Sequence, residues 1–109
     1  MAKVELFDKD LQLAASYFKA LGHPARLTIL KYLSDAKVCI SGDLSEELPL
    51  SRTTINQHLQ ELKNLGLIKG HIEGVKVNYC LDNDRIEELK MVIRDFLGEV
   101  NYCKNLNCD

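Results

Sequence analysis

The chain has 109 residues, which is enough for one domain and too few for two independent cores. Hydrophobic residues make up 46% of it and charged residues 28%, a balance typical of a soluble globular protein rather than a disordered one. No apolar run approaches the ~20 residues that span a bilayer, and MAKVELFDKD lacks the apolar core of a secretory signal. We therefore predict a cytoplasmic protein with no membrane partner.

Charge is unevenly distributed along the chain. The formal net charge of −2 by itself argues against a nucleic-acid partner. Residues 51–76, however, contain four basic and two acidic residues, a net charge of +2, whereas the remainder contains ten basic and fourteen acidic residues, a net charge of −4. The mildly basic middle is therefore suited to docking on phosphates.

Two helices separated by a tight break are predicted near the N-terminus. Apolar residues recur at helical spacing over residues 11–21, and Gly22 suits the end of this helix. Pro24 fits the first turn of a second helix, because its missing N–H would be unpaired there in any case. The second helix should end near Asp35. The side chains that we expect to face inward from it are Leu27, Ile29, Leu30 and Leu33.

A helix-turn-helix is predicted next. After a short extended piece at residues 37–40, residues 42–48 form a short helix that Pro49 ends, and residues 51–65 form a longer one. Ser51 is a good N-cap for the longer helix, and Gly66 closes it. Only a couple of residues join the two helices, as in a helix-turn-helix. The apolar stripe of the longer helix consists of Ile55, Leu59 and Leu62.

A β-hairpin and a long helix complete the pattern. Residues 67–81 predict two strands that turn at Glu73-Gly74, since glycine permits the positive φ of such turns. From about residue 84 to residue 100, apolar positions 86, 89, 93, 96, 97 and 100 form one helical stripe. The fold class is therefore mainly α with a small β-hairpin, in the order α-α-α-α-β-β-α. We predict one winged helix-turn-helix domain over residues 1–101 and a cysteine-containing tail over residues 102–109.

The first and last predicted helices are both amphipathic, and we expect them at opposite ends of the small domain. Together they are able to bury their apolar stripes against a second copy, which predicts a homodimer. The alternative is that both helices pack only onto their own core.

Three motifs resemble the ArsR/SmtB family of bacterial winged-helix repressors. They are FKALGHPARLTIL (18–30), LSRTTINQHLQELKNLGLI (50–68) and the Glu-Gly wing turn followed by VNYCL. The resemblance covers roughly residues 12–97. It implies a homodimer that binds an inverted-repeat operator in double-stranded DNA and releases it when an inducer binds.

The longer helix of the helix-turn-helix offers a polar outer face. Asn or Gln pairs with adenine and Arg with guanine in a major groove, whereas Ser51 and Thr53, near the positive helix N-terminus, suit phosphates. An ordinary solvated helix face is the alternative. His58, beside the apolar stripe, is expected to be packed and hydrogen-bonded rather than to read a base. The residues predicted to contact DNA are Ser51, Arg52, Thr53, Asn56, Gln57, Gln60 and Lys63, with Lys69 and Lys76 beside the wing.

The four cysteines are expected to be reduced thiols, because no export signal is present. Many arsenic-sensing members of the resembled family carry a CVCDL-like box, of which this chain keeps only the first cysteine, Cys39. Soft ions need at least two or three thiolates. Our hypothesis is a three-thiolate site for an As(III) or Sb(III) inducer, with no other cofactor required, built from Cys39, Cys103 and Cys108.

Other roles for these thiols stay open. Cys39 is also suited to being a small buried hydrophobic residue. The two tail cysteines could have no role, or two of these thiols could form a disulfide in a redox switch. Cys80 alternates out of phase with its apolar neighbours, so we expect it on the solvent face of its strand and rank it the least suitable ligand.

Competing functions find less support in the residues. The three histidines, His23, His58 and His71, do not combine with a nucleophile and an orienting acid, and there is no glycine-rich phosphate loop, so we predict that the chain is not an enzyme. The last helix contains no histidine, which argues against the zinc site that some members of the resembled family carry there. A winged-helix protein-interaction module and a ligand-independent regulator remain as alternatives.

Overall fold

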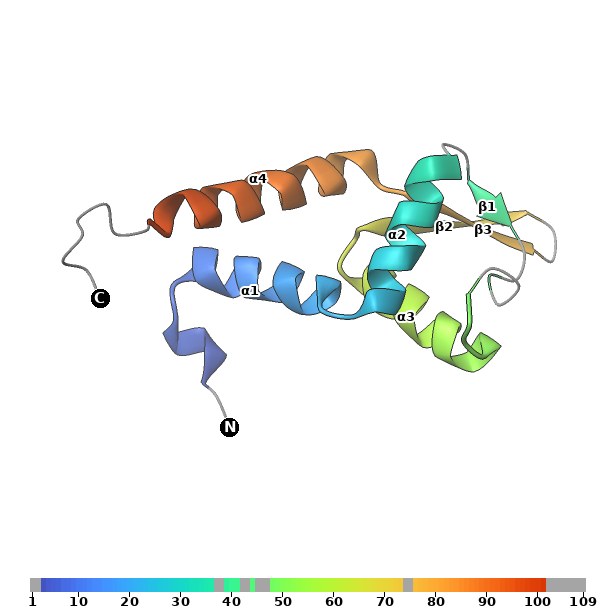
Figure 1. The fold of residues 1–109 in the computed structure, drawn as a ribbon, viewed down its shortest axis with the longest axis horizontal. Coiled ribbons are helices and arrows are strands. Elements are labelled where there is room, and N and C mark those ends of the chain that lie inside the picture. The colour runs from blue at the N-terminus through green and yellow to red at the C-terminus, as the bar shows by residue number, and fades with distance from the viewer. Residues whose placement is uncertain (1–2, 37–38, 42–43, 45–47, 74–75, 102–109) are drawn as a thin grey trace.

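The computed structural model describes residues 3–36, 39–41, 44, 48–73 and 76–101 (Figure 1). Within these ranges it contains a 3-10 turn, four α-helices and three β-strands. They are η1 (Val4–Leu6), α1 (Lys9–Leu21), α2 (Pro24–Ala36), β1 (Ile40–Ser41), α3 (Arg52–Asn64), β2 (Ile68–Glu73), β3 (Lys76–Leu81) and α4 (Asn83–Glu99). The order confirms the predicted winged helix-turn-helix.

The helices divide the domain into two ends. Figure 1 shows α1 and α4 side by side at one end, while α2, α3 and the three strands gather at the other. The expectation that the first and last helices lie at opposite ends of the domain is therefore wrong, because they pack against each other. The core runs between the two ends, so that α1 contributes to it together with α2, α3 and β2. Its largest fully buried side chains are those of Tyr17, Ile29, Ile55, Leu62, Leu67 and Ile68.

Side chains and one glycine mark the helix ends where the sequence predicts them. Ser51 caps α3, because its Oγ accepts a hydrogen bond from the Thr54 N–H at 3.2 Å. Gly66 follows α3 with a φ of +79°, a conformation that favours glycine. A Cβ at this position would also lie 2.9 Å from Cζ of Arg85, so the glycine gives space as well as conformational freedom. Gly22 ends α1 with a φ of −80°, so that stop does not depend on the left-handed region.

The sheet has one strand more than the predicted hairpin. Strands β2 and β3 pair antiparallel, from Ile68 opposite Leu81 to Glu73 opposite Lys76. The extended piece before the helix-turn-helix becomes β1, which pairs antiparallel with β3 through Ile40 opposite Tyr79 and Ser41 opposite Asn78. The strand order is therefore β1-β3-β2, and β3 lies in the middle. Gly74 in the predicted turn lies outside the described residues.

One predicted core position on α2 is wrong. Ala25, Ile29 and Leu33 are buried and Leu30 packs against the core, but Leu27 is 49% exposed. Buried residues spaced four apart define one helix face, and Leu27 lies two residues, or about 200°, away from Ile29. An apolar residue on the opposite face therefore remains on the surface.

The predicted helix over residues 42–48 lies mostly outside the described residues. Its two described leucines, Leu44 and Leu48, are buried, and the Leu48 N–H donates to the Leu44 carbonyl at 3.1 Å. These two residues thus share the inward face that the sequence predicts. No helix in the described part of the chain combines the length and apolarity needed to cross a membrane.

Candidate nucleic-acid interface

Helix α3 separates an apolar side from a polar side. Ile55, Leu59 and Leu62 are buried in the core, as their spacing predicts. The opposite side faces solvent. Its exposed residues include the predicted DNA contacts Arg52, Thr53, Asn56, Gln57, Gln60 and Lys63, together with the cap Ser51 and, on β2, Lys69. These residues are exposed at the surface of α3 and β2, and their individual contacts with DNA stay predictions.

Ser51 and Gln60, both predicted to contact DNA, form hydrogen bonds within the α3 segment. The Ser51 hydroxyl accepts from the Thr54 N–H and donates to the Thr54 Oγ1 at 3.0 Å. The Gln60 Nε2 donates to the Asn64 Oδ1 at 2.8 Å, one helical turn away. Ser51 therefore acts first as a cap, and a phosphate would have to share its hydroxyl. Lys76 begins β3, and its side chain lies outside the described residues.

Arg26 holds α3 in place from the inner side. Its guanidinium forms an ion pair with Glu61, and its Nε donates to Nδ1 of His58 at 3.1 Å. Its Nη1 also donates to the last-turn carbonyls of α1, those of Lys19 at 3.2 Å and Ala20 at 3.4 Å. One planar fork thus joins α1, α2 and α3. The position of Arg26, a charged residue inside the apolar run FKALGHPARLTIL, is the signal in the sequence that could have indicated a structural role for it.

His58 is packed and hydrogen-bonded, as predicted. It is 8% exposed, and its ring lies against that of His23 with the centroids 4.4 Å apart. Burial lowers the pKa of His58 below its ordinary value of 6.5, and the neighbouring His23 and Arg26 lower it further. The neutral ring leaves Nδ1 as an acceptor for the Arg26 N–H. The role of this histidine is therefore to hold α3 rather than to read bases.

The C-terminal end of α3 is fixed to α4. Nη1 of Arg85 donates to the Leu65 carbonyl at 3.0 Å, and Nε of the same side chain lies 3.5 Å from Oε2 of Glu88. That carboxylate oxygen accepts from the Tyr17 hydroxyl at 2.8 Å. Burial, and then the hydrogen bond to Glu88, raise the pKa of Tyr17. Polar contacts thus link the C-terminal end of α3 to both α1 and α4.

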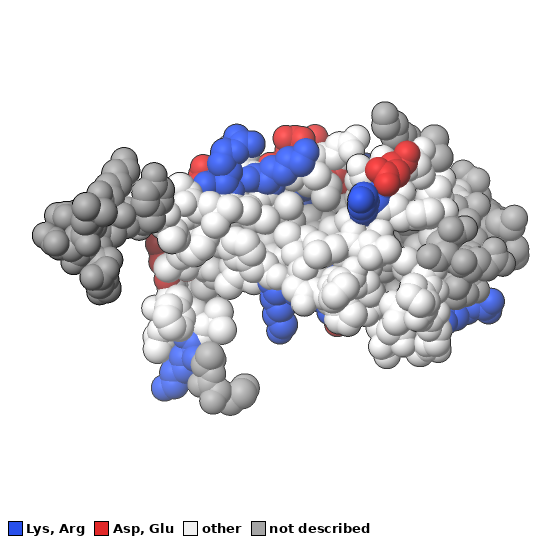
Figure 2. All heavy atoms as spheres, viewed as in Figure 1, with Lys and Arg blue, Asp and Glu red and all other residues white. Residues whose placement is uncertain are grey.

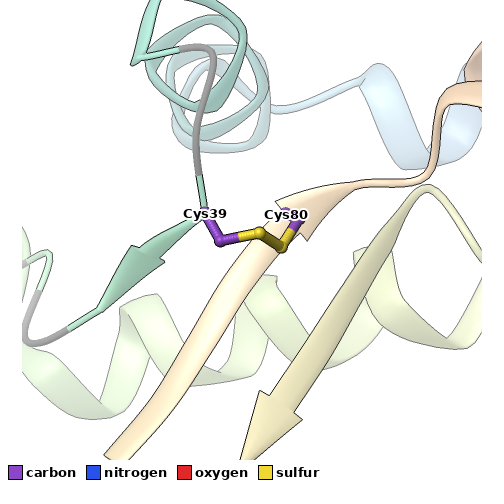
Figure 3. Close-up of a disulfide and its surroundings, with 2 residues drawn as sticks. All are labelled: Cys39 and Cys80. Carbon is purple, nitrogen blue, oxygen red and sulfur yellow. A yellow bond between two sulfur atoms is a disulfide. The ribbon is translucent and has the colours of Figure 1, made fainter.

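A disulfide that was not predicted from the sequence joins the β2–β3 hairpin to the residue before β1. Cys39 is bonded to Cys80, with the two Cα atoms 4.4 Å apart (Figure 3). The expectation of reduced thiols is therefore wrong for Cys39 and Cys80 in this structure, and Cys80 is half-buried rather than on the solvent face of its strand. The register explains the pairing: Ile40 lies opposite Tyr79, so one step back along β1 brings Cys39 opposite Cys80.

The disulfide also bears on the predicted three-thiolate site. Cys39 is engaged with Cys80, while Cys103 and Cys108 lie outside the described residues. The described ranges contain no group of three or more His, Cys, Asp or Glu side chains placed to hold a metal ion. The site built from these three cysteines stays a prediction, and it requires Cys39 in its reduced form.

Apolar side chains gather on the surface of α1 and α4, away from the sheet. A groove of about 180 Å³ lies between the two helices. Phe18 and Phe96 meet edge to face across them, with the ring centroids 5.7 Å apart. Figure 2 shows that the viewed face is largely free of charged side chains over these helices, and that charges gather along its edge. The exposed apolar residues at this end include Leu11, Leu13, Phe18, Met91, Leu97 and Val100.

Comparison with known proteins relates the chain to a family of transcriptional regulators. Residues 23–69 match the family described as bacterial regulatory protein, arsR family. An HTH-type transcriptional regulator of Methanocaldococcus jannaschii is 39% identical over 77 residues, which cover 70% of this chain and 85% of the relative. A cadmium resistance transcriptional regulatory protein CadC homolog of Staphylococcus aureus is 35% identical over 89 residues, covering 81% of this chain and 73% of the relative. These relatives are transcriptional regulators, in agreement with the prediction that the chain is not an enzyme.

A solved structure has the same fold. The homodimeric winged helix-turn-helix DNA-binding domain of a regulator from Mycobacterium bovis superposes with a TM-score of 0.63 at 24% identity, covering 91% of this chain and 94% of that one. At this identity the likeness concerns the fold alone.

Proposed function

Because the chain belongs to the ArsR family of bacterial regulatory proteins, we propose that it is a cytoplasmic transcriptional repressor that binds an inverted-repeat operator as a homodimer. The observation that carries this proposal is the exposed polar row on α3. The helix has 13 residues and is therefore about 20 Å long. That row matches the length and chemistry of a helix laid in a major groove. Lys69 on β2 adds a positive charge suited to a flanking phosphate.

The dimer is supported by the surface of α1 and α4. Leu11 and Leu13, which line the groove between these helices, are 44% and 39% exposed. Covering an apolar surface of this kind with a second copy lowers the free energy and so favours the dimer. A symmetric dimer would present two copies of α3, and operators read in this way have half-sites about one helical turn apart.

The inducer in this proposal is trivalent arsenic or antimony, bound by thiolates of Cys39, Cys103 and Cys108. Three soft sulfurs suit these ions, whereas a tetrahedral zinc site prefers a fourth ligand. The relative from Staphylococcus aureus is described as a cadmium resistance regulator, which supports a thiophilic ion as the effector. Binding would couple the tail to the start of β1, close to the helix-turn-helix, and a coupling of ~1–3 kcal/mol is enough for release.

The operator proposal is tested by selecting duplexes from a random DNA pool and then measuring binding to the selected sequence. We expect an inverted repeat, with an affinity that falls steeply as salt rises. Gln57→Ala should weaken binding to the selected duplex more than to random DNA, because a base contact specifies sequence. Lys63→Ala should weaken both and reduce the salt slope by about 1.

Lys90→Ala is the matched control, because it removes an equally exposed positive charge from α4, away from the row. Binding to DNA without any sequence preference, or an affinity that does not change with salt, would favour a protein-interaction module instead.

The inducer proposal is tested with arsenite and reduced protein. Thiolate absorption should rise and the selected duplex should be released. Both responses should be lost in Cys39→Ser and in the double variant Cys103→Ser with Cys108→Ser. Release that persists in the double variant would place the effector site elsewhere.

A further inference from the structure

Cys39 and Cys80 meet where the body of the domain joins the wing, which is the β2–β3 hairpin. Cys39 precedes β1 and follows the end of α2 by three residues, while Cys80 lies near the end of the middle strand, β3. Figure 3 shows the disulfide bridging these two strands. Cys39 is exposed and Cys80 half-buried, so a small reagent can reach the pair from solvent.

The bond closes a covalent loop around the DNA-reading part of the chain. The two cysteines are 41 residues apart in sequence. The enclosed segment contains α3, β2 and most of β3, and therefore every residue from Ser51 to Lys76 that is predicted to touch DNA. Without the disulfide, β1 is joined to β3 through only two residue pairs, Ile40 with Tyr79 and Ser41 with Asn78. The disulfide is thus the strongest link between the wing and the segment that follows α2.

We propose that Cys39 and Cys80 form a reversible dithiol–disulfide site, and that the disulfide holds the wing and α3 in the arrangement that binds DNA. The reagent class is a small-molecule disulfide as oxidant and a low-molecular-weight thiol as reductant. Only the DNA readout rests on the proposed function, and the thiol chemistry stands apart from it. The site shares Cys39 with the proposed arsenic or antimony site, which requires the reduced form of that cysteine.

The chemistry balances without any bound group. The exposed Cys39 thiolate attacks one sulfur of the small disulfide, so that a mixed disulfide forms and one small thiolate leaves. The Cys80 thiolate then attacks the Cys39 sulfur, which forms the protein disulfide and releases the second small thiolate. Two electrons pass from the protein thiols to the small disulfide, and the two protein protons end on the released thiols. Lys69 lies directly opposite Cys80 on β2, so the two side chains leave the same face of the sheet, and a nearby positive charge favours a thiolate.

Thiol mapping tests the chemistry. The full chain is equilibrated in buffers that range from reduced to oxidised glutathione, free thiols are alkylated, and the peptides are identified by mass. We expect a Cys39–Cys80 disulfide that forms and disappears reversibly, with Cys103 and Cys108 alkylated throughout. A pairing of Cys39 with either tail cysteine, or four thiols that stay alkylated in oxidised glutathione, would overturn the proposal.

Two further readouts test the consequence for the wing. Amide hydrogen exchange in β3 and α3 should be slower in the oxidised protein, and the oxidised protein should bind its selected duplex at least about five-fold more tightly. Cys39→Ser and Cys80→Ser should behave as the reduced protein in both conditions. The double variant Cys103→Ser with Cys108→Ser is the control and should keep the full response.

Equal exchange in the two states would overturn the link between the disulfide and the wing. Slower exchange without DNA binding in either state would support the link and would overturn the repressor proposal instead, so the two failures are distinguishable.

Discussion

The two ends of the domain present surfaces of opposite character. At the end that carries α3, apolar side chains are buried and the exposed row consists of amides, hydroxyls and cations. At the end formed by α1 and α4, leucine, phenylalanine and valine side chains remain exposed beside a groove. A polar row that is held rigidly suits a hydrated, charged partner, whereas an apolar surface suits a protein partner. In the proposed function, DNA meets the first end and a second copy of the chain covers the other.

The largest effect is expected for a substitution that disrupts the dimer contact at the apolar end. Leu11→Asp should raise the dissociation constant of the dimer at least about 100-fold, because a symmetric interface meets the change twice and each buried leucine contributes ~1.5–3 kcal/mol. Sedimentation equilibrium measures the shift. Leu27→Asp is the matched control, since Leu27 is 49% exposed, compared with 44% for Leu11, and lies on α2 away from the groove. Equal dimer affinity for the two variants would place the interface elsewhere.

The next effect concerns the Cys39–Cys80 disulfide, at the end of the domain that carries α3. Reducing the Cys39–Cys80 disulfide should lower the free energy of unfolding by about 2–4 kcal/mol, since the bond closes a loop of 41 residues in the unfolded chain. Urea unfolding with and without a dithiol reductant measures the change. Cys80→Ser should match the reduced wild-type chain and should not respond to the reductant. A variant as stable as the oxidised protein would show that the bond does not restrict the unfolded state.

A smaller effect separates contacts that position α3 from contacts that touch DNA. Arg26→Ala should cost about 1–3 kcal/mol of stability, because it removes a charged hydrogen bond to His58 and the ion pair to Glu61, which is partly exposed. Operator affinity should fall as well, although Arg26 lies on the inner side of α3. Arg26→Lys should recover only part of the loss, because an ammonium cannot reproduce the guanidinium fork.

Arg94→Ala is the control for Arg26→Ala, because it removes an exposed cation from α4. Equilibrium unfolding and operator binding are measured side by side for all three variants. An operator affinity unchanged in Arg26→Ala would show that α3 does not need this support to bind DNA.

Local signals in the sequence predicted most of the fold, and long-range ones explain the rest. The apolar spacing on α3, the cap Ser51 and the positive-φ Gly66 are all local features, and each lies where it was expected. The Cys39–Cys80 pair depends on the register of β1 against β3, which joins segments 41 residues apart. Periodicity alone does not specify that register.

The difference between local and long-range signals also explains what the sequence did not show about the surface of α4 and about Arg26. An apolar stripe on α4 predicts one buried side, but Leu89 is buried in the core while Leu97 and Val100 are about 60% exposed. The stripe shows which residues avoid water and does not show whether the same chain or a second copy covers them. Likewise, the sequence marks Arg26 as unusual, but its partners His58 and Glu61 are known only once α2 and α3 pack together.

The smallest expected effect is a pH dependence of the free energy of unfolding that arises from His58 on α3. Because the pKa of His58 is lowered in the folded protein, the unfolded chain takes up the proton first as pH falls below about 6.5. The stability that neutral His58 contributes is therefore complete above this pH and is lost progressively as pH falls toward the lower folded pKa. Protonation would also remove the Nδ1 acceptor and place a positive charge against Arg26 and His23, while Glu61 would offset part of that repulsion.

Urea unfolding at pH 7.5 and pH 5.5 measures this dependence. His58→Gln stays neutral at both values, so its loss of stability on acidification should be smaller than that of the wild-type chain. An equal loss in the two proteins would mean that His58 is as easily protonated in the folded state as in the unfolded one. The hydrogen bond from Arg26 to His58 would then add no net stability, and acidification would leave α3 in place.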